Sequence, residues 1–213
     1  MAKKILFQGD SITDVGRTQN GGPIGRGYPL LIASELGYEY PNEYEFYNRG
    51  ISGNRIVDLY ARIKADFINL EPDYASIYIG VNDTWHEISG KNGVATEKFE
   101  KIYTMMIDEI YEACPNIKLI IIAPFVLEGP ATCNTEEMPD KLERFRKDVA
   151  EKNAVAKKIA AKYNLPCIDL QPEFDKALLK ADASYWTFDG VHPSYNGHYL
   201  IKKLWLEAFN KIK

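Results

Sequence analysis

The stretch KKILFQGDS, residues 3–11, decides the fold of this chain. Residues 3–7 are predicted to form a short buried strand, which Gly9 ends. The next apolar segment has helical spacing and begins near Pro29, a residue favoured in the first turn of a helix. A strand that leads into a helix is the repeating unit of α/β proteins.

The same alternation continues along the chain. Four more strand candidates lie at residues 44–47, 74–79, 118–123 and 167–170, and segments with apolar residues at helical spacing separate them. No internal repeat or linker interrupts the pattern. We therefore expect fold class α/β: one three-layer α/β/α domain over residues 1–213, built on a five-stranded parallel sheet.

The composition is that of a globular protein. The chain has 213 residues, of which 46% are hydrophobic and 26% charged, and 26 basic against 30 acidic side chains give a net charge of -4. This balance gives no electrostatic reason to expect nucleic acid or an anionic membrane as partner. Uncharged stretches are too short to cross a bilayer, and the first residues lack a secretory apolar region, so we expect a cytoplasmic protein.

The cysteines carry no metal or redox pattern. Cys114, Cys133 and Cys167 are odd in number and lack the C-x-x-C spacing of a redox or zinc site. We expect each to be a small buried apolar residue in a reducing compartment.

Small and polar residues follow the first three predicted strands. These segments are GDS at 9–11, GISGN at 50–54 and GVND at 80–83. Taken singly, each could be an ordinary turn. In a parallel sheet, however, ligands bind outside the carboxyl ends of the strands, so the three segments together predict a site at that edge.

Histidine is the side chain suited to accept a proton near neutral pH, and the chain has three. His192 lies in DGVHP, residues 189–193, where a turn at Gly190 can bring the Asp189 carboxylate onto the imidazole Nδ1 and leave Nε2 free. His198 falls in the last predicted helix and is interpreted as a surface or packing residue. His86 has no carboxylate at a comparable spacing.

Two serines are candidates for a nucleophile that His192 could activate. Ser11 directly follows the first strand, and Ser52 stands beside Gly53 after the second. Ser194 is interpreted as the N-cap of the last helix. The G-x-S-x-G nucleophile motif of α/β-hydrolases is absent from the sequence.

Two further groups could stabilise a developing oxyanion. The Gly53 backbone N–H can approach a ligand closely because glycine has no Cβ, and the Asn82 side chain offers two uncharged N–H donors. A hydroxyl, a base, a carboxylate and oxyanion donors at one sheet edge are what nucleophilic acyl transfer needs.

At this point the sequence resembles the SGNH (GDSL-type) hydrolases. The segments GDSITD at 9–14, RGISGN at 49–54, GVND at 80–83 and DGVHP at 189–193 are similar to the four blocks of that superfamily, in the same order. The resemblance implies a flavodoxin-like sheet, with Ser11 as nucleophile, His192 as base and Asp189 as its orienting carboxylate. It also implies an oxyanion hole made of the Ser11 N–H, the Gly53 N–H and the Asn82 amide, and a reaction that needs no cofactor or metal.

The resemblance extends to one branch of the superfamily. The segments GY at 27–28, NRIVDL at 54–59, NDTW at 82–85, APF at 123–125 and EG at 128–129 are similar to intracellular bacterial acetylxylan and xylo-oligosaccharide esterases. This similarity implies an esterase for short acyl groups, above all acetyl, on a carbohydrate such as a xylo-oligosaccharide.

Substrate-binding candidates lie next to these segments. The aromatic residues predicted to flank the site are Tyr28, Trp85, Phe125 and Trp186, whose rings could stack on a sugar or could be core and rim packing. Asp10 and Arg55 are further candidates. The loops contain no long apolar segment suited to an acyl-chain tunnel, which favours a short acyl group.

Several alternatives stay open at this stage. The same fold also serves thioesterases, lysophospholipases and acyltransferases, and a carbohydrate-binding module could keep the fold without the reaction. A metal phosphoesterase using Asp10, Asp14 and His192 is a remoter possibility. The number of aromatic residues suggests that some reach the surface, where they favour a homo-oligomer.

Overall fold

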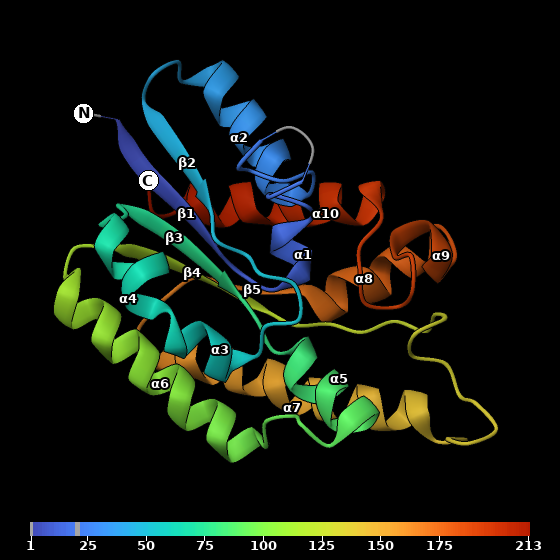
Figure 1. The fold of residues 1–213 in the computed structure, drawn as a ribbon. Coiled ribbons are helices and arrows are strands. Elements are labelled where there is room, and N and C mark those ends of the chain that lie inside the picture. The colour runs from blue at the N-terminus through green and yellow to red at the C-terminus, as the bar shows by residue number, and fades with distance from the viewer. Residues whose placement is uncertain (1, 20–21) are drawn as a thin grey trace.

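The computed structural model describes residues 2–19 and 22–213. Figure 1 shows parallel strands in the middle of the molecule with helices on both faces. The strands are β1 (Lys3–Gly9), β2 (Tyr44–Asn48), β3 (Tyr74–Tyr78), β4 (Lys118–Ala123) and β5 (Cys167–Asp169). The α-helices are α1 (Ser11–Asp14), α2 (Tyr28–Glu39), α3 (Ile56–Ala61), α4 (Ile63–Asp66), α5 (Val81–Gly90), α6 (Thr96–Ala113), α7 (Lys141–Lys162), α8 (Leu170–Leu178), α9 (Ala183–Trp186) and α10 (Tyr195–Phe209), and a 3₁₀ turn spans Ile68–Leu70.

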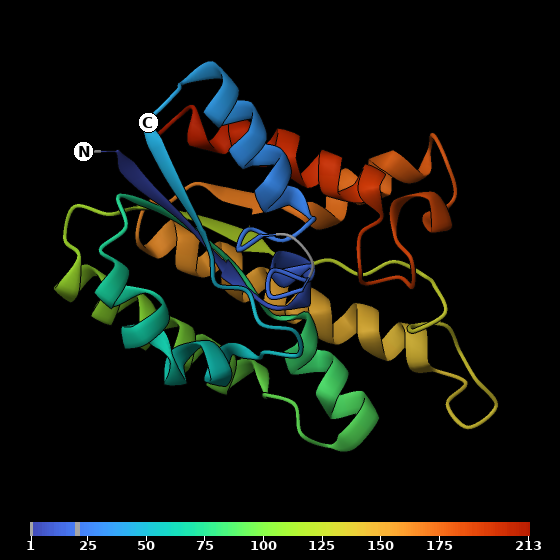
Figure 2. The ribbon, with the colours of Figure 1, turned by 45° about the horizontal axis from the view of Figure 1, so that its top comes forward.

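The five strands form one parallel sheet in the order β2-β1-β3-β4-β5. The predicted three-layer α/β/α architecture with a five-stranded parallel sheet is therefore confirmed, and the strand boundaries differ from the prediction by at most two residues. Helices α2 and α10 cover one face of the sheet, and α3, α4 and α6 cover the other, as Figures 1 and 2 both show.

Alternate residues of each central strand feed two separate cores. In β4, Ile120 and Ile122 pack toward α2 and α10, whereas Leu119 and Ile121 pack toward α3 and α6. Because helices cover both faces, the strand is apolar at successive positions rather than at every second one. This explains why β4 is the most hydrophobic segment of the sequence.

The core under α10 is built mainly from aromatic rings. Trp205 stacks on Phe209 with ring centroids 4.9 Å apart, and Phe7 of β1 lies 5.5 Å from Trp205. All three side chains are fully buried. Their packing joins the last helix of the chain to its first strand, and so fixes the start of α10 relative to the end of β1.

The cysteines do not lie in the core, contrary to the sequence-based expectation. Cys114 and Cys133 are partly exposed and Cys167 is exposed. Cys114 caps the end of α6, and Cys167 begins β5, which has a neighbouring strand on one side only. Cys114 and Cys167 thus lie at the ends of elements, at the margin of the core rather than inside it.

Several aromatic side chains do reach the surface, as the composition suggested. They are Tyr38, Tyr185, Phe188, Tyr195 and Tyr199, each more than half exposed. No helix among residues 2–19 and 22–213 is long and apolar enough to cross a membrane.

The loop after β2 lies directly on the backbone of α1. A Cβ atom on Gly50 would stand 2.4 Å from the Asp14 nitrogen and 2.9 Å from the Asp10 carbonyl oxygen. These neighbours are backbone atoms, which cannot rotate away. Only glycine allows the loop to come this close to α1.

The substitution Gly50→Ala is expected to lower the free energy of unfolding by about 1–3 kcal/mol, because the added methyl group forces two backbone segments apart. Gly37→Ala is the matched control: it lies inside α2 with nothing within 4 Å of its Cβ position, and it is expected to raise stability by about 0.5–1 kcal/mol. Urea denaturation measures both. Equal stabilities of the two variants would contradict the close approach of the loop to α1.

Candidate active site

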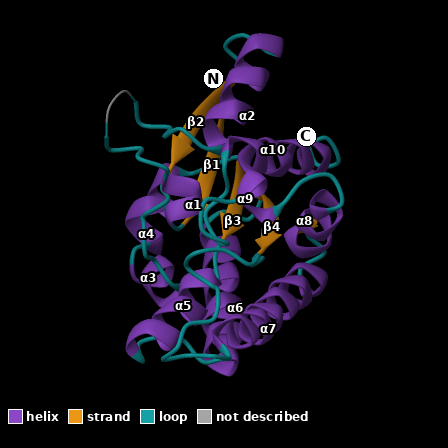
Figure 3. Cartoon of the chain, turned by 90° about the vertical axis from the view of Figure 1, so that its right-hand side faces the viewer, coloured by secondary structure: helices purple, strands orange, loops and turns teal. Residues whose placement is uncertain are grey.

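The four predicted turns meet at the carboxyl edge of the sheet. Figure 3 faces this edge, with α1, α5 and α9 gathered in front of the strands. Ser11 is the first residue of α1, directly after β1, and the Asp10 carboxylate caps that helix by accepting the Ile12 N–H at 3.0 Å. This cap holds the Ser11 side chain at the end of β1.

Ser11 and His192 are joined although 181 positions separate them in sequence. The Ser11 Oγ lies 2.9 Å from the His192 Nε2. On the other side of the ring, the His192 Nδ1 lies 2.7 Å from the Asp189 Oδ2. The three side chains thus form a continuous hydrogen-bonded chain from carboxylate to imidazole to hydroxyl.

The turn at 189–193 holds the imidazole in place through its own backbone. The other oxygen of Asp189, Oδ1, accepts the N–H groups of Val191 and His192 at 2.9 and 2.8 Å. Gly190 has a φ of 98°, which a residue with a side chain rarely adopts. The turn therefore points the carboxylate back onto the ring, as the Asp-x-x-His spacing predicts.

The charges of this turn shift the pKa values of both partners. The hydrogen bond that the His192 ring donates to the Asp189 carboxylate raises the pKa of His192 above its usual value, although burial opposes the shift. Burial alone would raise the pKa of Asp189, but the hydrogen bonds from the His192 ring and the two N–H groups outweigh burial and lower it below 3.8. The carboxylate thus stays ionised and stabilises a protonated imidazole.

The two predicted oxyanion donors lie beside Ser11. A cavity of about 380 Å³ is lined by Ser11, Gly53, Asn82, Trp85 and His192, among others. Gly53 has a φ of 82°, which lies in the left-handed region that glycine adopts readily because it has no Cβ. Asn82 stands in the first turn of α5, and its amide donates to the Asn54 carbonyl at 3.1 Å.

The loop that carries Gly53 is held at both ends by carboxylates. At one end, the Asp14 Oδ2 accepts the N–H and the hydroxyl of Ser52 at 3.1 and 3.0 Å. At the other end, the buried Asp83 carboxyl accepts the Ile56 N–H at 3.1 Å. Asp14 belongs to the helix of Ser11, and Asp83 follows Asn82, so the loop is tied to the segments that carry both of these residues.

Comparison with known proteins identifies the family. The model of the GDSL-like lipase/acylhydrolase family matches residues 7–200. The chain belongs to this family. The acetylxylan esterase of Geobacillus stearothermophilus is 32% identical over 215 residues, which cover 96% of this chain and 92% of the relative. Together the family and this relative make the protein a carboxylic ester hydrolase.

Solved structures of the family have the same fold. A protein of Parabacteroides merdae described as a GDSL-like lipase is 34% identical, with a TM-score of 0.85 over 99% of this chain and 97% of its own. The acetylxylan esterase Axe2 of Geobacillus stearothermophilus is 31% identical, with a TM-score of 0.83 over 97% of this chain and 93% of its own. The flavodoxin-like SGNH hydrolase fold is thereby confirmed.

Ser52 does not point its hydroxyl to the base. Its Oγ donates to Asp14, whereas the Ser11 Oγ is hydrogen-bonded to His192. Of the two serines that the sequence offered, the structure pairs only Ser11 with the histidine. Ser194 caps α10, as predicted, by accepting the N–H groups of Asn196 and Gly197.

Two predicted substrate-binding residues lie behind the site rather than on its surface. Tyr28 is fully buried and its hydroxyl is 2.9 Å from the Thr13 Oγ1. Asp10 is fully buried too, and burial raises the pKa of its carboxyl to about 7. Neither side chain presents a surface to a substrate, because the segments that precede α1 and α2 turn them inward.

Three other predicted residues have internal partners as well. The Arg55 guanidinium binds the Asp58 carboxylate and the Asn92 carbonyl, so it links α3 to the loop after α5. Phe125 is buried and stacks on Phe174 at 3.9 Å. The half-buried Trp186 donates its indole N–H to the Ala181 carbonyl at 3.2 Å.

Of the aromatic candidates, Trp85 lies at the site. It lines the cavity with Gly53 and Asn82, and its ring centroid is 5.8 Å from that of His192. His198 is buried against Tyr28 and accepts the Tyr28 N–H on its Nδ1, which agrees with the interpretation as a packing residue. Burial lowers the pKa of His198 to about 4.

Sequence reasoning missed the positioning roles of Asp14 and Asp83. Both stand inside the segments GDSITD and GVND, so an acidic residue next to a predicted catalytic residue was the available signal. It also missed Phe188 and Tyr195, which line a second cavity at Ser11 and carry no distinctive motif. Within the described residues, no group of three His, Cys, Asp or Glu side chains is arranged to hold a metal ion.

The pKa of His192 tests the hydrogen-bonded chain directly. In Ser11→Ala, NMR pH titration is expected to give a His192 pKa above 6.5, because the Asp189 carboxylate favours the charged ring. Adding Asp189→Asn removes that carboxylate and is expected to lower the His192 pKa. His198 is the internal control and should keep its low pKa in both variants. The same His192 pKa with and without Asp189→Asn would contradict the coupling.

Proposed function

We propose that the protein is a serine esterase that removes acetyl groups from carbohydrates such as xylo-oligosaccharides through an acyl-enzyme. The observation that carries the catalytic part is the hydrogen-bonded chain of Asp189, His192 and Ser11, with contacts of 2.7 and 2.9 Å. This order of carboxylate, imidazole and hydroxyl is the arrangement that activates a serine for acyl transfer.

In the first step, the Ser11 Oγ attacks the ester carbonyl carbon while the His192 Nε2 accepts the hydroxyl proton. The carbonyl oxygen becomes an oxyanion, which the N–H groups of Ser11 and Gly53 and the Asn82 amide stabilise. His192 then gives its proton to the leaving alcohol oxygen, and Ser11 keeps the acyl group as an ester.

In the second step, water attacks the acyl-enzyme. His192 accepts a proton from the water and returns it to the Ser11 Oγ as the acid leaves. The base must be neutral at the start of each step. Since the Asp189 carboxylate raises the pKa of His192, kcat/KM is expected to rise as the pH passes upward through that pKa.

Relatives support both parts of the proposal. Solved catalytic mutants of the esterase Axe2 replace a serine, an aspartate or a histidine by alanine, and the aspartate and the histidine are three positions apart, as Asp189 and His192 are. Axe2 is described as an acetyl-xylooligosaccharide esterase. Trp85 lines the cavity beside Gly53 and Asn82, and the modest volume of this cavity, about 380 Å³, favours a short acyl group there.

The substitution Ser11→Ala is expected to reduce acetate release from acetylated xylo-oligosaccharides to background, because it removes the hydroxyl that is hydrogen-bonded to the His192 Nε2 and that would carry the acyl group. Ser52→Ala is the matched control: it removes a hydroxyl that donates to Asp14 and not to His192, while the backbone N–H of residue 52 still donates to Asp14, so most activity is expected to remain. Acetate is quantified enzymatically, and circular dichroism checks that both variants are folded.

Three outcomes would contradict this assignment. Wild-type turnover by Ser11→Ala would show that another group is the nucleophile. A higher kcat/KM for decanoyl or thioester substrates than for acetyl esters would favour a lysophospholipase or a thioesterase, and acetyl transfer to an added alcohol in preference to water would favour an acyltransferase.

Asn82→Ala is expected to lower kcat about 10²–10³-fold with a much smaller change in KM, because an oxyanion donor acts mainly on the transition state. Steady-state kinetics on p-nitrophenyl acetate separates the two constants. A change confined to KM would instead make Asn82 a group that binds the substrate in its ground state.

A further inference from the structure

Two cavities meet at Ser11 and His192. The smaller one, of about 380 Å³, contains the oxyanion donors Gly53 and Asn82. The larger one, of about 520 Å³, extends from the same two residues along α1 to the start of α10. Both volumes fall in the range of small-molecule sites. An ester bound at Ser11 therefore has a separate space for each of its two halves.

One wall of the larger cavity is aromatic. Phe188 and Tyr195 line it, with ring centroids 6.1 Å apart and ring planes at 89°. Phe188 is 62% exposed and Tyr195 is 79% exposed, so most of each ring faces solvent. Water contact with this much apolar surface is unfavourable, and a ligand that covers the rings would remove it.

The backbone holds both rings in place. The Phe188 N–H donates to the His192 carbonyl at 2.8 Å, which fixes Phe188 to the turn that carries the base. Tyr195 is the first residue of α10, directly after the Ser194 cap. A ligand stacked on these rings is thus positioned relative to the imidazole.

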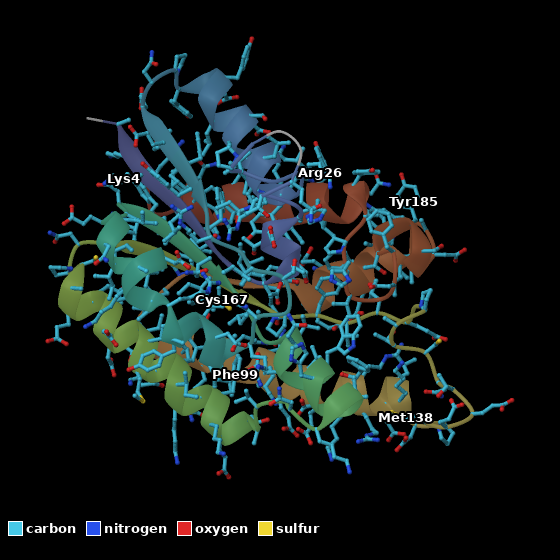
Figure 4. All side chains as sticks on the ribbon, in the orientation of Figure 1. Lys4, Arg26, Phe99, Met138, Cys167 and Tyr185 are labelled. Carbon is cyan, nitrogen blue, oxygen red and sulfur yellow. The ribbon has the colours of Figure 1, made fainter. Side chains whose placement is uncertain are left out.

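The rest of the wall is apolar at Ile12, Val15 and Pro193 and polar elsewhere. The polar part includes Thr18, Gln19 and Arg26, which supply hydroxyl, amide and guanidinium donors. Figure 4 labels Arg26, which stands on the loop between α1 and α2. Aromatic faces on one side and hydrogen-bond donors on another suit a sugar, which has apolar C–H faces and hydroxyl groups at its rim.

The chemistry of the reaction decides which half of the ester lies here. The oxyanion must point toward Gly53 and Asn82, into the smaller cavity. The leaving oxygen must lie near the His192 Nε2, which protonates it. With the acetyl methyl group beside Trp85, the alcohol extends past His192 toward Phe188 and Tyr195.

We propose that Phe188 and Tyr195 form the binding wall for the sugar alcohol of the ester, and that they select carbohydrate acetates over simple ones. This proposal deepens the proposed function and rests on it. Its occupant is a pentose or hexose residue that carries the acetyl group.

The test compares two substrates on the same variants. For Phe188→Ala and for Tyr195→Ala, kcat/KM on acetylated xylobiose divided by kcat/KM on ethyl acetate is expected to fall about tenfold, which corresponds to about 1.4 kcal/mol of lost binding. Ethyl acetate has no sugar ring to stack on Phe188 or Tyr195, so the ratio measures what these two rings contribute to recognition of the sugar. The variant Phe188→Tyr keeps a ring and is expected to restore the ratio.

Tyr38→Ala is the matched control. Tyr38 is 88% exposed on α2 but does not line the cavity, so the ratio should stay at the wild-type value. Light scattering on each variant measures whether removing a ring also changes the oligomeric state.

The possible results separate the two proposals. A wild-type ratio in both alanine variants would contradict the proposal that Phe188 and Tyr195 bind the sugar, and would leave the deacetylase assignment intact. Wild-type protein that hydrolyses ethyl acetate but not acetylated xylobiose would overturn the carbohydrate assignment and the wall with it. A smaller molecular mass together with equal losses on both substrates would assign the rings to an interface between copies of the chain.

Discussion

The contact between the Gly50 loop and the backbone of α1 is the constraint on which the site depends. It places the segment with Gly53 against the helix that begins with Ser11, at the distance that a residue without Cβ allows. Carboxylates then fix the segment: Asp14 holds Ser52, and Asp83 holds Ile56. The proposed oxyanion donors and the proposed nucleophile are thus tied together before any substrate arrives, which is the condition for electrostatic stabilisation of a transition state.

The sheet and the contact between Asp189 and His192 could be predicted from the sequence because local patterns carry them. The apolar run of β4 reflects burial on both faces, and the Asp189 to His192 spacing reflects a single turn closed by hydrogen bonds within the turn itself. When a residue contacts its neighbours in sequence, the spacing of the two residues predicts the contact. Predicting that Ser11 lies near His192 needed one more step, the rule that the carboxyl ends of parallel strands meet at a common edge of the sheet.

The substrate-binding residues were less predictable because side-chain direction depends on distant partners. Tyr28 and Arg55 stand next to predicted site segments, yet Thr13 takes the hydroxyl of the first, and Asp58 and Asn92 take the guanidinium of the second. No motif marked Phe188 or Tyr195, whose position at the site follows from how α10 packs on β1. Closeness in sequence to a predicted catalytic residue is thus a weaker indicator of contact with the substrate than a position at the carboxyl edge of the sheet.

The separation of 181 positions between Ser11 and His192 has a consequence for biosynthesis. A chain leaving the ribosome exposes Ser11 with the first strand, but His192 follows only in the turn that precedes the final helix. Until this last part of the chain packs onto β1, where Trp205 contacts Phe7, the Ser11 hydroxyl has no imidazole partner. On the proposed mechanism, nascent and truncated chains would therefore not hydrolyse esters, and hydrolytic activity would report completion of the whole fold.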